Sequence, residues 1–310
     1  MIEIKNLVKH YGDHFALDGI SFSVGKGEIV GFLGPNGAGK STTMNIITGF
    51  LSCDSGTVTV GGCDILDEPE KVKKQIGYLP EMPPLYYDMT VAEYMDFVYE
   101  LKGCTLPKKP HLDEIAKVTK TLDVGDRLIG NLSKGYRQRV GIAQALVGDP
   151  DVIIFDEPTV GLDPKQIIEI RNLIRKLGRN HTVILSTHIL SEVQSVCDRV
   201  VIIENGRIIA DEKTDEITAA VNQARRFKVK ICGSQREVLS ALRNMDGISY
   251  AELTGERDGD GNTYIVESEK GIDVRKPLFR LCAERDFPII GMEGANMSLE
   301  EVFIKLTDRK

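Results

Sequence analysis

Hydrophobic and polar positions follow two different patterns in the strand-like parts of the chain. Strict alternation runs through residues 1–5 and again through Ser55–Val60, as expected for half-buried antiparallel strands. Two short runs, Ile29–Leu33 and Val152–Phe155, are instead continuously apolar. Such runs are typical of parallel strands that are covered on both faces. The pattern therefore predicts a buried parallel sheet together with a separate antiparallel one.

Helical spacing marks two stretches between these strands, residues 90–101 and 111–122. Thr90 and Glu93 stand three residues apart at the start of the first stretch, which predicts a capping box there. We therefore expect a helical insert within an α/β core.

The rhythm changes at Phe227, and from there short strands and helices follow one another in the order β-α-β-β-α-β. This order predicts a small ferredoxin-like α+β domain. Ser234 with Glu237 predicts a capping box at its first helix, and Ser298 with Glu301 predicts another at a helix that follows the domain. The predicted strands cover residues 227–231, 248–253, 264–267 and 288–292, and the second helix covers residues 272–285.

The segment Gly34–Ser41 fits G-x-x-x-x-G-K-[ST], the P-loop, and it directly follows an apolar strand. Backbone N–H groups of such a loop close around a β-phosphate, and the following helix points its positive end at the same anion. Lys40 would reach the β- and γ-phosphates, and the Ser41 hydroxyl would enter the octahedral shell of Mg²⁺. A glycine-rich turn without a ligand is the alternative. The predicted nucleotide-binding residues of the loop are Gly34, Pro35, Asn36, Gly37, Ala38, Gly39, Lys40, Ser41 and Thr42.

Two carboxylates end the second apolar run. Asp156 could hold Mg²⁺ through water, and Glu157 could accept a proton from a water that attacks the γ-phosphate. Alternatively, both acids simply end a strand at the surface. Ser133 and Gly135 stand before this strand, where they are placed to cap a helix. Taken alone, that segment is an ordinary helix start.

The order of these segments is similar to that of the ATP-binding cassette (ABC) ATPases. It runs from the P-loop through Leu-Ser-x-Gly and the strand with Asp-Glu to Gly161-Leu162-Asp163 and Ser186-Thr187-His188. The resemblance implies a P-loop NTPase cassette with a parallel-sheet core, an antiparallel β subdomain and a helical subdomain. We therefore expect the cassette at residues 1–215, a connector at 216–226 and the ferredoxin-like accessory domain at 227–310.

The resemblance also implies roles for single residues. Tyr11 would stack on adenine, although a half-buried strand tyrosine is the alternative. Ser133 and the amide of Gly135 would contact the γ-phosphate held by a second cassette, and Asp163 would lie at the seam between the two subunits. His188 would bond the γ-phosphate and orient the attacking water; by itself, a histidine after an apolar strand is usually a strand-end residue.

Two departures from the family pattern are visible. Glu81 stands where the family normally has a glutamine that binds Mg²⁺, and a carboxylate would bind the metal more strongly but repel the γ-phosphate. Lys134 and Tyr136 replace a glycine and a glutamine beside Ser133. We expect a competent site in which Lys134 adds a cation near the phosphate of the second subunit. The predicted metal ligands are Ser41, Asp156 and Glu81.

Composition agrees with this resemblance. The 310 residues suffice for two domains with cores of their own, and a formal charge of −7 without a basic stripe argues against nucleic acid as a partner. Six scattered cysteines without a Cys-x-x-Cys pair fit reduced thiols. No window approaches the roughly 20 apolar residues of a spanning helix, and the first residues do not form a signal peptide. We expect a cytoplasmic protein, peripheral at the inner face of the cell membrane through its permease.

The function implied is an ATP hydrolase that powers the separate transmembrane permease subunits of an exporter through ATP-driven pairing with a second cassette. In the family the helical insert meets the permease, and Pro83–Tyr87 is either part of that contact or an ordinary turn. Soluble cassette ATPases that act on ribosomes, DNA ends or iron–sulfur assembly usually carry a second cassette or a coiled-coil insertion, which this chain does not show. A cassette that does not hydrolyse ATP would lack Glu157 or His188.

One further segment imitates a calcium loop. Asp258–Asn262 and Glu269 match its start and end, but Thr263 takes the position that requires glycine, and strands rather than helices flank it. A hairpin turn is therefore the prediction.

Overall fold

The computed structural model describes residues 1–215, 226–269 and 271–295. The chain divides into two compact units, one spanning Met1–Thr214 and the other beginning at Asp215, and each is described by itself. Most of the expected connector, residues 216–225, and the helix expected from Ser298 lie outside the described residues.

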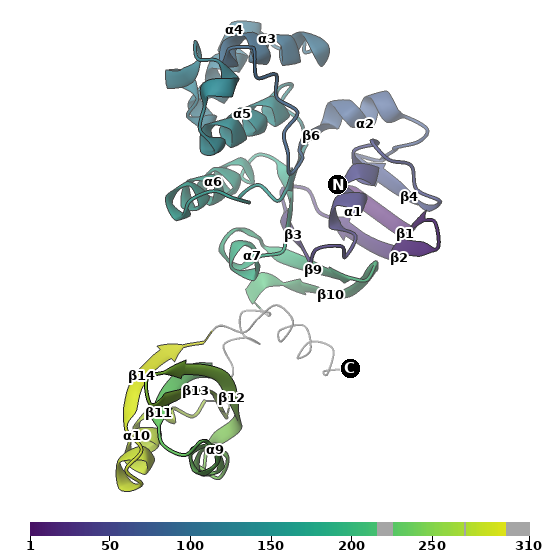
Figure 1. Cartoon of the computed structure of the whole chain (residues 1–310). Helices are drawn as coiled ribbons and strands as arrows, with labels where there is room; N and C mark the ends of the chain where they lie inside the picture. Colours follow the sequence, from purple (N-terminus) through teal and green to yellow (C-terminus); the bar gives the residue numbers. More distant parts are fainter. Residues whose placement is uncertain (216–225, 270, 296–310) are drawn as a thin grey trace. The chain divides into compact units, whose positions relative to one another are not determined.

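The first unit is built on a six-stranded sheet (Figure 1). The neighbouring strands from β9 through β3, β8 and β7 to β6 run parallel, and β10 pairs antiparallel with β9 at one edge. Every residue of β3, β7 and β8 is buried, which confirms the parallel sheet expected from the apolar runs. The strands are β3 (Ile29–Leu33), β6 (Ile76–Leu79), β7 (Val152–Asp156), β8 (Thr182–Thr187), β9 (Arg199–Glu204) and β10 (Arg207–Lys213).

Helices cover both faces of this sheet. Helix α1 (Lys40–Ile47) lies on one face, whereas α6 (Pro164–Leu177) and α7 (Leu190–Val196) lie on the other (Figure 1). The carboxyl ends of the parallel strands therefore meet the beginnings of these helices, which is where open α/β sheets place their ligands.

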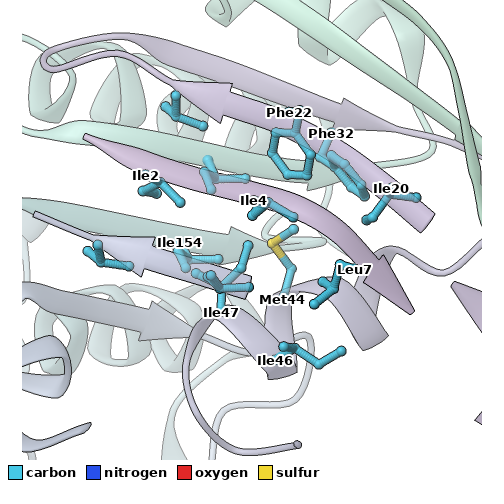
Figure 2. Packing of buried hydrophobic residues seen from close by; sticks show 14 of the residues in the cluster. Ile2, Ile4, Leu7, Ile20, Phe22, Phe32, Met44, Ile46, Ile47 and Ile154 are labelled. Atoms are coloured by element: carbon cyan, nitrogen blue, oxygen red, sulfur yellow. The ribbon is translucent and has the colours of Figure 1, made fainter. Parts of the chain in front are cut away.

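A second, antiparallel sheet packs against the other side of α1. Its strand order is β2-β1-β4-β5, and α2 (Pro69–Gln75) follows it. Met44 and Ile47 of α1 meet Ile4 of β1 in one apolar cluster that also reaches Phe32 and Ile154 of the parallel sheet (Figure 2). Each fully buried side chain of this size stabilises the fold by about 1.5–3 kcal/mol, so the cluster holds the two sheets together around α1. The strands are β1 (Ile2–Tyr11), β2 (His14–Val24), β4 (Ser55–Val60) and β5 (Cys63–Asp64).

The helical insert contains α3 (Val91–Leu101), α4 (Lys108–Thr119) and α5 (Lys134–Leu146), with the short 3₁₀ turns η1 (Leu122–Val124) and η2 (Ile129–Asn131). Thr90 and Glu93 form the predicted capping box of α3. Helix α4 begins three residues before the predicted start, because Pro110 falls in its first turn, where no helical N–H bond is lost. Among the described helices none combines the length and the apolar character that crossing a bilayer requires.

The second unit is a four-stranded antiparallel sheet in the order β12-β13-β11-β14. This order, with the two helices between the strands as predicted, is the ferredoxin-like arrangement. Phe227, Val229 and Tyr264 of the sheet share one core with Leu242 and Leu278 of the helices. The elements are β11 (Arg226–Cys232), α9 (Gln235–Arg243), β12 (Ile248–Asp258), β13 (Gly261–Ser268), α10 (Arg275–Glu284) and β14 (Ile289–Gly294).

Two details of this unit differ from expectation. Ser234 is the N-cap of α9, but its side chain makes no capping hydrogen bond, so the predicted capping box is wrong. Helix α10 begins at Arg275, because the Asp273 carboxylate accepts the Arg275 N–H at 3.2 Å and holds the chain in a turn there. The hairpin prediction is confirmed, since Asp258 pairs with Gly261 across a two-residue turn.

Long charged side chains cross one face of the second sheet. Lys228 and Lys230 of β11 form ion pairs with Glu256 and Asp258 of β12, at 3.1 and 2.7 Å. Because β13 lies between those two strands, each pair spans the middle of the sheet. Thr263 of β13 is 1 % exposed.

Candidate active site

A cavity of about 370 Å³ lies where β3, β7 and β8 end and α1 begins. The structure brings nine of the predicted site residues to its wall, and adds Ala16 and Val160, which sequence reasoning missed. Neither residue carries chemistry that a sequence pattern could reveal. The predicted residues in the wall are Asn36, Gly37, Gly39, Lys40, Ser41, Thr42, Glu81, Glu157 and His188.

Gly39 shapes the end of the P-loop. Its φ is +110°, a left-handed value that side chains disfavour, and a Cβ atom at this position would lie 2.6 Å from the backbone oxygen of Ala16. The close approach of two backbones explains why the loop needs glycine here. Gly39 is also the N-cap of α1, with no side chain over the first N–H groups of the helix. Those groups are placed to bind an anion.

Lys40 is 6 % exposed and lies at the centre of the site. Its Nζ donates to the backbone oxygens of Gly34 at 2.8 Å and Pro35 at 3.2 Å, and it lies 3.4 Å from Glu157 Oε1. A buried ammonium with several acceptors is strongly constrained in position. Gly34 and Pro35 therefore help to hold the Lys40 ammonium in the cavity wall, and Ala38 of the same loop is buried.

Glu157 has an unusual backbone. Its φ of +48° is rare for a residue with a side chain, and outliers of this kind persist where the surrounding structure enforces them. The Glu157 N–H donates to the Ser186 backbone oxygen at 2.9 Å, which fixes the strand end. The bend turns a carboxylate that is 7 % exposed towards the cavity.

His188 faces this carboxylate. Its Nδ1 lies 2.9 Å from both Glu157 oxygens. A carboxylate accepts hydrogen bonds only, so Nδ1 carries the proton and donates, and Nε2 is the nitrogen left for other partners. Lys40, Glu157 and His188 thus form one charged group beside the P-loop.

Asp156 lies behind the cavity rather than in its wall. It is 2 % exposed, and it accepts a hydrogen bond from Ser186 Oγ at 2.7 Å. Its charge also acts on Tyr78: burial, and then the Asp156 carboxylate, raise the pKa of that phenol. Ser186 was not predicted as a site residue, although its pairing with Asp156 follows once β7 and β8 are known to be neighbours.

Oxygen donors suitable for a hard cation are present around the cavity. Ser41 and Glu81 line it, and Asp156 stands behind. The described residues contain no group of three carboxylate, imidazole or thiol side chains able to hold a metal by themselves. This donor set fits Mg²⁺, which takes one or two protein ligands and completes its shell with waters and phosphates.

Four predicted site residues lie away from this cavity. Tyr11, at the end of β1, is 53 % exposed. Ser133 caps α5 by accepting from the Tyr136 N–H at 3.4 Å, and Asp163 caps α6 by accepting from the Gln166 N–H at 2.9 Å. The two caps are neighbours, because a Cβ atom on Gly135 would lie 2.6 Å from Gln166 Cδ.

The two unusual residues of the Leu-Ser-x-Gly segment lie against other parts of the chain. The Lys134 ammonium lies against Gly161, in the loop that leads to Asp163. The Tyr136 hydroxyl donates to Asp123 Oδ2 at 2.7 Å, and this bond raises the pKa of the phenol. Lys134 thus lies close to the loop before α6, and Tyr136 connects α5 to η1 through a hydrogen bond.

Comparisons with known proteins agree with these features. Residues 17–160 match the family model described as ABC transporter. The ABC transporter ATP-binding protein YhcH of Bacillus subtilis is 39% identical over 99% of this chain and 96% of its own length. The bacitracin transport ATP-binding protein BcrA of Bacillus licheniformis is 31% identical over 99% and 97%. A solved dimeric ATP-binding cassette, bound to ADP and Pi after hydrolysis, is 28% identical, with a TM-score of 0.63 over 69% of this chain and 99% of its own.

Proposed function

The chain belongs to the ABC transporter family and is an ATP-hydrolysing subunit that powers a separate membrane transporter, and we propose that the cavity beside α1 is its ATP site, with Glu157, His188 and Lys40 as the catalytic residues. One observation carries the assignment. Lys40 and His188 both reach the Glu157 carboxylate, within 3.4 Å, next to a P-loop.

The P-loop residues Gly34–Thr42 bind the phosphates in this proposal. The γ-phosphate carries more negative charge than a carbonyl oxygen, so it draws the Lys40 ammonium, and this neutralises charge on the phosphoryl group during transfer. Glu157 takes a proton from the attacking water, and His188 bonds the γ-phosphate and orients that water.

Ser41, Asp156 and Glu81 are the proposed ligands of Mg²⁺, with Asp156 acting through water. When bound, the ion neutralises charge on the β- and γ-phosphates. Ser186 keeps the Asp156 carboxylate in place through the 2.7 Å hydrogen bond.

Glu81→Gln should raise the Mg²⁺ concentration needed for half-maximal ATPase activity by on the order of 10-fold, because an amide binds a hard cation less strongly than a carboxylate. Activity measured across a magnesium titration tests this. Glu70→Gln, in a side chain that is 82 % exposed, serves as the control. An unchanged titration curve would remove Glu81 from the metal site.

Ser133, Gly135 and Asp163 form the second half of the site in this proposal. They lie outside the cavity of their own chain, and Ser133 and Asp163 stand at the starts of two helices whose first turns are neighbours. Each cassette of a dimer would offer these residues to the nucleotide of the other, so two ATP molecules are enclosed between two subunits.

Tyr11→Ala should weaken ATP binding by about 1–3 kcal/mol, or roughly 5- to 150-fold, through loss of stacking on the base. Tyr11→Phe keeps the ring and should bind normally. Since stacking does not depend on base identity, GTP binding should fall by the same factor. Titration of a fluorescent nucleotide measures both; equal affinities for Tyr11→Ala and the parent chain would exclude the stacking role.

Exposed apolar side chains between Met82 and Leu128, called the patch here, are the proposed contact with the permease. The patch consists of Met82, Tyr86, Tyr87 and Leu128, which are 83, 48, 53 and 42% exposed. The loop that carries the patch is held by two backbone bonds, from Ile129 to Met89 and from Gly130 to Tyr87. Exposed apolar side chains in the segment that directly follows Glu81 fit a partner that responds to nucleotide.

We further propose that the transporter exports its cargo and that the chain lies at the inner face of the cell membrane. Relatives named for bacitracin transport, linearmycin resistance and Nod factor export support this direction. Purification of the tagged chain from detergent extracts should yield a permease with it. Tyr86→Asp should reduce this yield without affecting ATP binding, whereas Leu66→Asp, also exposed but on the other subdomain, should not. An equal yield of permease with the parent chain, Tyr86→Asp and Leu66→Asp would exclude the patch as the contact.

A further inference from the structure

Glu192 is a buried carboxylate that the mechanism above does not use. It lies in the first turn of α7, and its side chain is 1 % exposed. We propose that Glu192 is a positioning residue that holds the Glu157 segment and the His188 segment in one arrangement. This inference rests on the roles proposed above for those two residues.

The two oxygens of Glu192 reach two different loops. Thr159 donates its hydroxyl proton to Oε1, and Thr187 donates to Oε2 at 2.8 Å. Thr159 follows Glu157 by two residues, and Thr187 directly precedes His188. One carboxylate therefore links the segment that carries the proposed base to the segment that carries its histidine partner.

The sheet fixes these segments only up to the strand ends. The last bond between them along the sheet is the one from the Glu157 N–H to the Ser186 backbone oxygen, at 2.9 Å. Beyond that bond the segment after Glu157 leaves the sheet, whereas β8 continues to Thr187, which still pairs with Leu33 of β3. Glu192 links the two segments again, beside the contact between His188 and Glu157. Hydrogen bonds at two separate points fix both the position and the orientation of the Glu157 segment relative to the His188 segment. A bond at one point alone would leave the orientation free.

The charge of Glu192 determines the direction of these bonds. Because a carboxylate only accepts, both threonine protons must point at it. The lone pairs of Thr187 Oγ1 then face the backbone, where this oxygen accepts the Ile189 N–H at 3.1 Å. This bond closes a small turn around His188, so the orientation of the histidine depends on Glu192.

The buried Glu192 carboxylate has one cationic partner among the residues that the structure describes. Arg171 of α6 places Nη2 3.5 Å from Oε1. Its Nε is buried, and no acceptor for it is found within the described part of the chain. A buried charge with a distant, partly satisfied partner is costly for stability. A role in aligning the two loops accounts for a carboxylate at this place.

Glu192→Ala should lower kcat by on the order of 10²-fold, since small displacements of catalytic groups have effects of this size, while the ATP dissociation constant changes by less than about twofold. Glu192→Gln keeps the shape and one acceptor, and should lose less. Ser191→Ala changes an exposed neighbour on the same helix and should behave as the parent chain. A loss of ATP affinity as large as the loss of kcat would overturn the proposal, as would wild-type turnover.

A double-mutant cycle separates positioning from general stability. Thr187→Val and Thr159→Val should each lower kcat in the parent chain, but should have less than about a twofold effect once Glu192 is Ala. Additive losses would overturn the proposal. If Glu192→Ala does not fold, the same cycle with Glu192→Gln decides. Full turnover of Glu157→Gln would instead overturn the proposed base, so the two failures are distinguishable.

Discussion

Glu157→Gln is expected to lower ATP turnover by about 10²–10⁴-fold while ATP binding survives. The amide keeps the size and the hydrogen-bonding reach of the side chain, but it cannot take a proton from water. The unusual φ of +48° at this position is a property of the backbone, so glutamine should occupy it as glutamate does. Phosphate release under saturating ATP measures turnover, and a fluorescent nucleotide measures binding.

The same variant should also accumulate as an ATP-bound dimer. In the proposed mechanism hydrolysis reopens the pair, so blocking hydrolysis should leave two cassettes closed around two nucleotides. Size-exclusion chromatography in ATP and in ADP should therefore show a dimer in ATP alone. Glu70→Gln, far more exposed, is the control for loss of one negative charge. Undiminished turnover would show that another group activates the water.

Lys40→Met should abolish measurable ATPase activity and weaken ATP binding by about 2–5 kcal/mol, which is the usual cost of truncating one partner of a buried charge pair. Methionine retains most of the apolar length of lysine, so the buried space stays filled. Because the variant also removes the ammonium that lies 3.4 Å from the buried Glu157 carboxylate, its stability must be checked. Thermal unfolding of the variant is therefore compared with that of the parent chain. Unchanged binding would remove the P-loop from the ATP site.

Mixing this variant with Ser133→Asn tests the shared site. Each chain alone should be inactive, because every site then lacks either Lys40 or Ser133. A mixed dimer has one site with both residues intact, so an equal mixture should regain about a quarter of the parent activity if pairing is random. Asparagine also serves as an N-cap, so the loss cannot come from fraying of α5. A chain that hydrolyses ATP at full rate as a strict monomer would contradict the shared site.

The sequence predicted best the elements whose chemistry is local. The P-loop must stand between a buried strand and a helix, and the structure has β3 and α1 on either side of it. The Thr90 and Glu93 capping box also depends on neighbouring residues alone. By contrast, Ser234 and Glu237 fit the same pattern and make no such box, because the pattern does not say where the Ser234 side chain points.

Parts of the site that depend on distant segments were not predictable. Ala16 reaches the cavity because its backbone approaches Gly39, and Ser186 supports Asp156 because β7 and β8 are neighbours. Glu192 has three partners that lie 5, 21 and 33 residues away along the chain. Such contacts follow from the packing of α6 and α7 on the sheet, which hydrophobic spacing alone does not specify.

The ion pairs of Lys228 and Lys230 on the second sheet limit which surfaces of that unit can bind another protein. A protein that binds over β13 would have to dehydrate four charged side chains, Lys228, Lys230, Glu256 and Asp258. These side chains already form ion pairs with one another. Dehydrating such ion pairs is unfavourable unless the binding partner offers complementary charges of its own. We therefore expect this face of the sheet to stay hydrated. Contacts between this unit and another protein are expected at the edges of the sheet or at the helices instead.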